Sequence, residues 1–275
     1  MAWPDASVIR VVTVAEPGAE SFLAMPGVMV SAETIDRIMD GTRAQSEELL
    51  STSAGQLTRP DRVVDTAFLE GRVASAIAAA GRDFHADVIV VGHHGRGALG
   101  SMLLGSVSAE LVEYTTTPVL VAHGESLRRL ILADDGSASA AAARALVARM
   151  PGFKGLAVRV VSVSDRPPGW VGWLEPEAPD DIEALETAIE SEHERHDALA
   201  VASAAELSAA GLVADSASPV GDPGTEIVRA AQAFGADVIV MGTRGQTGLE
   251  RLLVGSVARK VLNHAHCSIL VLPSR

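Results

Sequence analysis

The sequence has little of three things that would define its class: cysteine, aromatic residues and positive charge. Its one cysteine, Cys267, cannot form an internal disulfide, which fits a reducing cytosol. Aromatic residues make up 3% of the chain against 48% apolar residues in all, so the core must be built from alanine, valine, isoleucine and leucine. The net charge of −13 argues against nucleic-acid binding, which depends on neutralising phosphates with lysine and arginine.

Long apolar runs are absent as well. No stretch approaches the ~20 apolar residues that a membrane-spanning helix requires, and the strongest candidate, residues 198–214, is broken by Glu206, Ser208 and Gly211. The first residues lack the basic segment and the following apolar segment of a secretory signal. We therefore expect a soluble, cytoplasmic protein that binds neither nucleic acid nor membrane.

What the sequence does contain is a glycine-rich stretch between an apolar strand and a helix. Residues 236–241 have the pattern of a buried parallel strand; Gly242-Thr-Arg-Gly245 follows directly and, after nine more residues, Gly255-Ser256. Ser256 is the expected N-cap of the helix that follows. Glycines let backbone N–H groups approach a ligand closely, and the first helical turn leaves N–H donors unpaired. The stretch therefore predicts a phosphate-binding site.

The same pattern occurs a second time, 150 residues earlier in the chain. Gly92-His-His-Gly95, nine further residues and Gly105-Ser106 follow a strand at residues 86–91. Glycines at strand ends often serve turn geometry alone, but a doubled long spacing in the same strand–loop–helix context favours a functional motif. The repeat predicts two tandem domains, residues 1–125 and residues 126–275.

The second half alternates strands and helices along its whole length. We expect five strands, near residues 129–133, 156–163, 212–217, 236–241 and 268–272. Such alternation is typical of an α/β fold with a parallel sheet and helices on both faces, and ligands of these sheets bind at the carboxyl ends of the strands. Asp135 follows the first strand, so it can share a ligand with the Gly242 loop only if the two strands are neighbours.

Three motifs of the second half resemble the universal stress protein family, and the glycine spacing is that of its ATP-binding branch. They are Asp135-Gly-Ser after the first strand, Val220-Gly-Asp-Pro before the third helix, and Gly-2x-Gly-9x-Gly-Ser from Gly242. The resemblance covers residues 126–275 fully and residues 8–123 except for one piece. It implies the adenine nucleotide alpha-hydrolase-like fold, a parallel sheet of order 3-2-1-4-5 in each domain, pairing of the domains through their last strands, a cytoplasmic location, and bound ATP or another adenine nucleotide.

Carried over position by position, the resemblance assigns a part of the nucleotide to each site residue. Asp135 would hydrogen-bond the ribose hydroxyls, Ala133 would line the base pocket, and the backbone of Val163 would meet the adenine edge. Met241 and Gly242 would line the base and ribose side. The phosphates would lie against the glycine stretch and the first helical turn, at Gly245, Gly255, Ser256 and Val257. A carboxylate for vicinal hydroxyls and amides for phosphate suit the hydrogen-bonding capacities of those groups, and Mg²⁺ is expected with the ATP.

The first half departs from this pattern at its beginning. It has 125 residues where the second half has 150, and residues 128–150 have no counterpart in it, so it lacks an equivalent of Asp135. In the family order the missing strand is central, so the strands beside it must pair directly, leave a gap or borrow a strand. A gap would leave backbone groups buried and unpaired, at a cost of about 1–3 kcal/mol for each group. We therefore favour a translation start placed too far downstream as the explanation of the deficit. We expect a weak or empty nucleotide site in this half, where the remaining counterparts are Val14, Gly92, Gly95, Gly105, Ser106 and Val107.

Other polar and aromatic residues have simpler interpretations than a second site. Asp134-Asp135 resembles the acidic pocket of response-regulator receivers, but the Lys-Pro that would complete that pattern is missing. A structural N-cap or exposed loop position is the simpler alternative for Asp135. Trp170 and Trp173 are expected to anchor a loop, with a lid over the nucleotide as the alternative.

The histidines lack the partners of a metal site. Neighbouring ligands in sequence seldom point at one ion, and carboxylate or cysteine partners at ligand spacing are missing. We expect exposed loop histidines at His93, His94, His264 and His266, and solvated histidines on a polar helix at His193 and His196. No metal ligand is predicted.

The sequence shows no nucleophile–base constellation, and no Gly-Lys-Ser/Thr follows either glycine stretch. We therefore expect no catalytic residues and at most slow, incidental ATP hydrolysis. The expected function is that of a nucleotide-dependent stress-response or regulatory protein; the alternative is an interaction and dimerisation module with vestigial nucleotide sites. The apolar strands at residues 119–121 and 269–272 are expected to join the halves as a pseudo-dimer, with a homodimer of chains as a further option.

Overall fold

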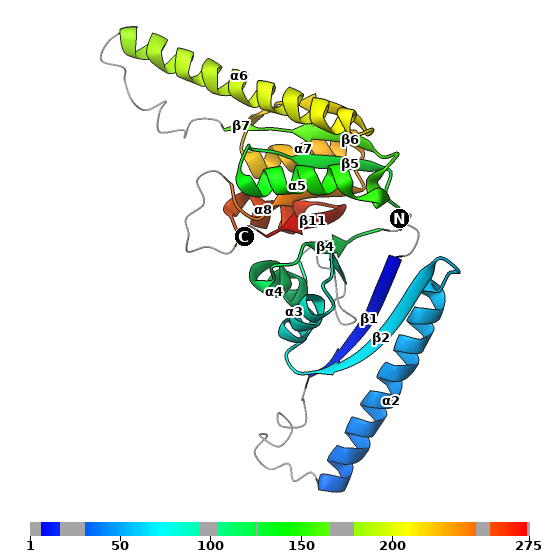
Figure 1. Ribbon diagram of the computed structural model, residues 1–275. Helices are drawn as coiled ribbons and strands as arrows, with labels where there is room; N and C mark the ends of the chain where they lie inside the picture. The colour runs from blue at the N-terminus through cyan, green and yellow to red at the C-terminus, as the bar shows by residue number, and fades with distance from the viewer. Residues whose placement is uncertain are drawn as a thin grey trace. The chain divides into compact units, whose positions relative to one another are not determined.

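The computed structural model describes residues 7–16, 31–93, 104–124, 126–165, 179–245 and 254–273. They belong to two compact units, residues 2–86 and residues 87–275, each with its own sheet (Figure 1). The predicted boundary between the sequence repeats, at residue 125, is a different division and stays a prediction. None of the helices that the structure describes is both long and apolar enough to cross a membrane.

The first unit contains two parallel strands joined by a long helix. Its elements are β1 (Ser7–Ala15), α2 (Ala32–Leu57), β2 (Arg62–Glu70) and α3 (Val73–Asp83). β1 lies parallel to β2, with Ser7 opposite Arg62, and α2 packs against both strands. Ser31 caps α2, and its side chain accepts a hydrogen bond from the amide of Thr34. A parallel pair requires a crossover connection of this kind.

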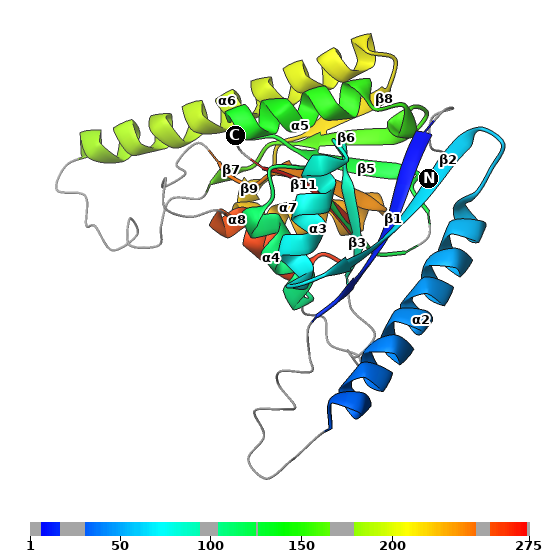
Figure 2. The same ribbon diagram turned by 60° about the horizontal axis from the view of Figure 1, so that its bottom comes forward.

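The second unit is built on a seven-stranded sheet of order β3-β4-β11-β10-β5-β6-β8. Figure 2 shows β5 and β6 of this sheet side by side. Its strands are β3 (Ile89–Gly92), β4 (Val119–Ala122), β5 (Arg129–Ala133), β6 (Ala157–Val161), β8 (Val213–Ala217), β10 (Val238–Gly242) and β11 (Ser268–Leu272). Its helices are α4 (Ser106–Tyr114), α5 (Ala138–Arg149), α6 (Pro179–Ala209), α7 (Pro223–Phe234) and α8 (Ser256–His264). A short parallel pair, β7 (Ser164–Asp165) with β9 (Val220–Gly221), and a 3-10 turn, Pro151–Phe153, complete it.

Within this sheet the second half of the sequence has the predicted strand order. The run β8-β6-β5-β10-β11 is the order 3-2-1-4-5, and each neighbouring pair in it is parallel. The α/β fold with a mostly parallel sheet is therefore confirmed. Because β5 and β10 are neighbours, the turn after β5 and the glycine loop after β10 lie on the same rim of the sheet.

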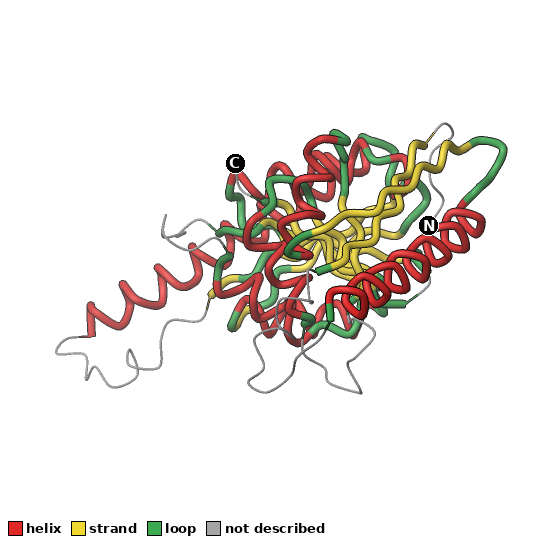
Figure 3. Tube along the Cα trace, turned by 90° about the horizontal axis from the view of Figure 1, so that it is seen from below, coloured by secondary structure: helices red, strands yellow, loops and turns green. Residues whose placement is uncertain are grey.

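Helices cover both faces of this part of the sheet. α5 packs against α6 on one face, and α7 packs against α8 on the other. Figure 3 shows the strands, in yellow, with helices, in red, on either side. Leu132 and Val240 belong to the buried cluster on the α5 and α6 face of the sheet. Ile131 and Ile239, each one residue earlier on the same strands, are also fully buried, and strand alternation points them to the opposite face. Phe153 is the one aromatic residue among the largest fully buried side chains of the described chain, so the aliphatic core expected from the composition is confirmed.

The last strands of the two halves pair with each other. β4 and β11 are antiparallel, with Val121 opposite Ile269 and Val119 opposite Val271, and all four side chains are buried. The structure therefore confirms the expected contact between the last strands, which continues one sheet from the second half into the end of the first.

The strands of the first half are divided between two sheets. Among the described residues β1 pairs with β2, and β3 pairs with β4. Of the three arrangements considered for a half without its central strand, direct pairing of β1 with β3 is therefore not the one adopted.

The repeat is also visible in a matched set of side chains. In the first unit Arg10 donates to Asp65 at 2.8 Å and its guanidinium carbon lies 4.4 Å from the centre of the Phe84 ring. In the second, Arg159 donates to Asp215 at 2.7 Å and lies 4.5 Å from the ring centre of Phe234. In both places an arginine links a strand to the next strand and to the helix that follows, which shows that the sequence repeat is a structural repeat.

Candidate functional site

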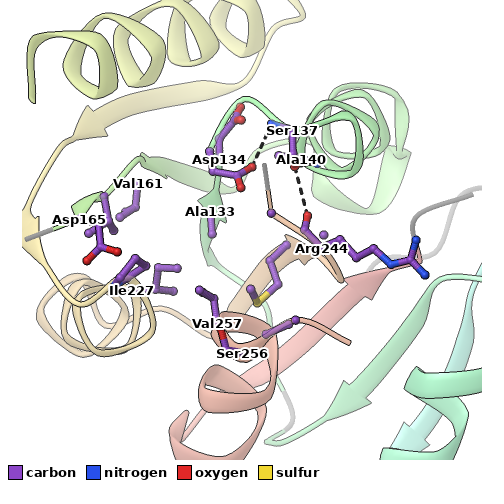
Figure 4. Close-up of a pocket in the computed structure, with 18 of the residues that line it drawn as sticks. Ala133, Asp134, Ser137, Ala140, Val161, Asp165, Ile227, Arg244, Ser256 and Val257 are labelled. Carbon is purple, nitrogen blue, oxygen red and sulfur yellow. Dashed lines mark hydrogen bonds between the residues drawn. The ribbon is translucent and has the colours of Figure 1, made fainter. Parts of the chain in front are cut away.

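A cavity of about 480 Å³ opens at the carboxyl ends of β5, β6 and β10. It contains every site residue predicted for the second half: Ala133, Asp135, Val163, Met241, Gly242, Gly245, Gly255, Ser256 and Val257. Ile227 and Asp165 lie on one side of it and Arg244 on the other, with Ser256 and Val257 below Ala133 (Figure 4). Residues from the ends of β5, β6 and β10, from β7, and from helices α5, α6, α7 and α8 thus line one space, and the strand order brings β5, β6 and β10 together there.

The turn after β5 separates two neighbouring carboxylates. Asp134 is 2% exposed and its side chain accepts a hydrogen bond from the amide of Gly136 at 2.9 Å, while Asp135 accepts one from the amide of Ser137 at 3.0 Å. Gly136 has a φ of 78°, a conformation that favours glycine. The tight turn leads directly into α5, whose N-cap is Ser137, and leaves Asp135 at the cavity.

Asp134 belongs to the framework of the site. Its carboxylate receives hydrogen bonds from Arg144 of α5 and, at 2.9 Å, from Ser203 of α6. Arg144 also donates to Glu206 at 2.6 Å. Burial opposes the charge of Arg144, but the carboxylates of Asp134 and Glu206 raise its pKa overall. These contacts hold α5 and α6 against the end of β5.

The glycine loop is held at both ends by backbone and hydroxyl contacts. The amide of Thr243 donates to the carbonyl of Leu272 at 2.8 Å, and the amide of Gly255 donates to the carbonyl of Thr243 at 2.7 Å. The hydroxyls of Ser137, at 3.3 Å, and Ser139 donate to the carbonyl of Arg244. Residues 246–253 lie outside the described part of the loop.

The glycines of this loop leave little room for a side chain because other groups come very close. A Cβ on Gly242 would lie 2.2 Å from the Oγ of Ser139, and a Cβ on Gly245 would lie 2.8 Å from a carboxylate oxygen of Asp135. A Cβ on Gly255 would lie 3.1 Å from the carbonyl oxygen of Thr243. Asp135 and Gly245, which the family resemblance assigned to the same nucleotide, are therefore in direct proximity.

The first turn of α8 faces the cavity. Its N-cap is Gly255, so the prediction that Ser256 caps the helix was wrong by one residue. The first helical hydrogen bond runs from the amide of Arg259 to the carbonyl of Gly255 at 3.0 Å. The amides of Ser256 and Val257 precede that bond and have no partner within the helix. They are the kind of donors that bind an anion at a helix N-terminus.

Asp222, which belongs to the Val220-Gly-Asp-Pro motif, lines the cavity. It caps α7 and accepts hydrogen bonds from the amide of Thr225 at 2.9 Å and from Lys260 of α8 at 2.7 Å. The hydrogen bond from Lys260 is the largest cause that lowers the pKa of Asp222, to about 2. The carboxylate therefore links α7 and α8 at the edge of the site.

The sequence also gave no sign of a role for α6, which contributes Glu192, Arg195 and His196 to the cavity wall. His196 is 6% exposed, so the prediction that it is solvated was wrong. Its spacing held a usable signal: His196, Ala200 and Leu207 are all buried and repeat at helical intervals. A histidine on the same face of a helix as buried apolar residues is expected to be buried too, and buried polar groups have hydrogen-bond partners.

The counterparts in the first half are only partly placed. The amide of Gly105 donates to the carbonyl of His93 at 3.1 Å, which repeats the Gly255–Thr243 bond, and Gly92, Ser106 and Val107 belong to the same unit. Gly95 lies outside the described residues, and Val14 belongs to the other compact unit.

The histidine predictions met different outcomes. His93 is 8% exposed, so its predicted exposure was wrong; His264 and His266 are exposed as predicted. His94, Trp170 and Trp173 lie outside the described residues. Burial raises the pKa of the Cys267 thiol to about 11, so this group is not a ready thiolate ligand at neutral pH.

A model of the universal stress protein family matches the chain twice, over residues 5–123 and residues 126–273. A universal stress protein of Methanocaldococcus jannaschii is 59% identical over 51 residues, 18% of this chain and 30% of the relative. One from Mycolicibacterium smegmatis is 29% identical over 200 residues, 69% of this chain and 63% of the relative. In both cases the match spans less than two thirds of the relative's own length.

Solved structures show the same fold at low identity. A universal stress protein from Archaeoglobus fulgidus has a TM-score of 0.62 and 20% identity, covering 98% of this chain and 86% of the other. A putative universal stress protein from Pseudomonas aeruginosa has a TM-score of 0.60 and 18% identity, covering 98% and 93%. At this level of identity the agreement concerns the fold alone.

Proposed function

Because the chain belongs to the universal stress protein family, we propose that its second half binds an adenine nucleotide, expected to be ATP, as part of a stress-response or regulatory role. The observation that carries the proposal is the meeting of Asp135, the close-packed Gly245 and the first turn of α8 around one cavity. A carboxylate, a glycine cradle and helix N-terminal amides are the groups that a ribose and a phosphate chain require.

The phosphates would bind at the glycine loop and α8. The amides of Ser256 and Val257 and the Ser256 hydroxyl are donors, and Gly245 and Gly255 leave space that a Cβ would fill. Among the described residues no group of three acidic, histidine or cysteine side chains could hold a metal ion. Any Mg²⁺ would therefore arrive with the phosphates, where it neutralises their charge.

The base would bind at the apolar end of the cavity. Ala133, Val161, Ile227 and Met241 line it and are all at most 8% exposed. The amides of Ser162 and Ser164 donate toward β8 and the segment after it, so strand alternation turns the amide of Val163 the other way, past the end of β5. Its main chain is then available to the edge of an adenine ring.

We expect no dedicated enzymatic activity, with at most slow hydrolysis of bound ATP. A cytoplasmic location, which the family resemblance implies, stays a prediction. The antiparallel β4–β11 pairing favours a second role, in which the joined halves act as an interaction module and the nucleotide site is vestigial. Nucleotide binding distinguishes the two.

The proposal is tested with a fluorescent ATP analogue and two glycine variants. Gly245→Val would displace the Asp135 carboxylate and Gly255→Val would crowd the Thr243 carbonyl, so both should weaken binding at least tenfold. Gly55→Val is the matched control, because this helical glycine has no atom within 4 Å of its Cβ position. Unchanged affinity in both cavity variants would contradict the nucleotide site.

A further inference from the structure

The α6 wall of the cavity contains a histidine with competing partners. His196 is 6% exposed and its Nδ1 lies 2.8 Å from the Oγ of Ser162. Its Nε2 lies 3.0 Å from a guanidinium nitrogen of Arg195 and 3.2 Å from a carboxylate oxygen of Glu192. Arg195 and Glu192 also pair with each other, at 2.6 Å. The ring thus faces both a group that only donates and a group that only accepts.

The charge of the ring decides which of these two groups it binds. A neutral ring that carries its proton on Nδ1 donates to Ser162 and accepts from Arg195 through Nε2. A protonated ring has a donor on both nitrogens, so Nε2 donates to Glu192 and is repelled by the guanidinium of Arg195. Protonation therefore exchanges Arg195 for Glu192 as the partner of His196.

Resting on the proposed nucleotide site, we propose that His196 is a positioning residue that makes nucleotide binding tighter as the pH falls. Protonation adds a positive charge to the cavity wall and releases Arg195 from the ring. Both changes favour a polyanionic ligand. The ring bonds the hydroxyl of Ser162, the residue that precedes Val163, whose main chain is proposed to meet the base.

The other charged groups around the cavity do not change in the same way. Beside Glu192 and Arg195 on α6, they are Asp135 after β5, Asp165 on β7, Asp222 before α7 and the start of the glycine loop at Arg244. The hydrogen bond from Arg195 lowers the pKa of Glu192, and that from Lys260 lowers the pKa of Asp222, so both stay charged at neutral pH. His196 is the one histidine among the described residues of the cavity wall. Histidine is the side-chain type whose charge changes between about pH 5 and 8.

The test is the affinity for a fluorescent ATP analogue between about pH 5.5 and 8, in the full chain and in His196→Gln. We expect the wild-type affinity to rise by a factor of about three to ten relative to the variant as the pH falls, as one added charge near a phosphate chain would produce. The ratio of the two proteins cancels the titration of the ligand's own phosphate. His193→Gln is the matched control, because His193 lies three residues earlier on α6 but does not line the cavity; it should keep the wild-type profile.

Glu192→Gln provides a second variant that leaves the buried ring in place. Loss of the carboxylate removes the partner of the protonated ring, so the affinity change should move to lower pH. The role of His196 would be overturned if the affinity of the wild type and of His196→Gln changed with pH in the same way. It would also be overturned if Glu192→Gln did not shift the pH at which the affinity changes. Either result would leave the nucleotide site intact. No binding at any pH would overturn the proposed function, and this inference with it.

Discussion

Asp134 and Asp135 are neighbours in the chain, but their carboxylates are in different surroundings. Asp134 is buried, and its carboxylate accepts hydrogen bonds from the amide of Gly136, the hydroxyl of Ser203 and the guanidinium of Arg144, so protein groups stabilise its negative charge. Asp135 reaches the cavity, with Gly245 close to one of its oxygens. At the scale of single residues, the first carboxylate holds the framework and the second lines the cavity.

This difference predicts opposite results for two matched substitutions. Asp134→Asn would remove the buried anionic partner of the partly buried Arg144, which keeps only its contact with the exposed Glu206, and should lower the free energy of unfolding by about 3 kcal/mol. Asp135→Asn keeps an oxygen for the amide of Ser137 and should change stability by less than about 1 kcal/mol. Urea unfolding of both variants measures this. Equal stability losses would contradict the division of roles.

At the scale of elements, α7 and α8 are joined by one ion pair at the rim of the site. Asp222, the cap of α7, accepts from Lys260 of α8 at 2.7 Å. A Cβ on Gly224 would lie 2.8 Å from Lys260, so the lysine stem packs over the first turn of α7. The pair therefore fixes where the two helices begin relative to each other.

Removal of Lys260 should raise the pKa of Asp222 from about 2 toward its ordinary value of 3.8. Because the folded pKa lies below the unfolded one, the pair stabilises the fold above about pH 4 and loses its effect as the pH falls toward 2. Carboxyl NMR titration of Lys260→Met measures the shift. Lys154→Met, at an exposed lysine before β6, is the control. An unmoved Asp222 titration in Lys260→Met would show that the lysine is not its main partner.

Much of the element scale could be predicted from the sequence because its signals are local. Apolar runs located the strands, and the family resemblance supplied their order, so Asp135 and Gly245 could be assigned to one site. The α6 wall could not be found in this way: Glu192, Arg195 and His196 reach the cavity only because a long helix crosses the end of β6. The cap of α8 was misplaced by one residue because Gly255 and Ser256 are both acceptable caps.

At the scale of the whole molecule, the chain is a repeat whose halves are unequal. The matched contacts of Arg10 and Arg159 show the common plan, and β4–β11 pairing joins the two halves in one sheet. Among its described residues the first half shows no counterpart of β5 or of Asp135, and its strands are divided between two sheets. The division into two sheets could not be predicted, since it depends on hydrogen-bond pairing between strands that are far apart in the sequence. The asymmetry leads us to expect one effective nucleotide site per chain.

Calorimetric titration of the full chain with ATP and Mg²⁺ tests this claim most directly. We expect one site per chain, with binding at least tenfold weaker in Asp135→Asn, because the charge-assisted hydrogen bonds to the ribose hydroxyls are lost. Two sites of equal affinity per chain, or an Asp135→Asn variant that binds as tightly as the wild type, would contradict the account.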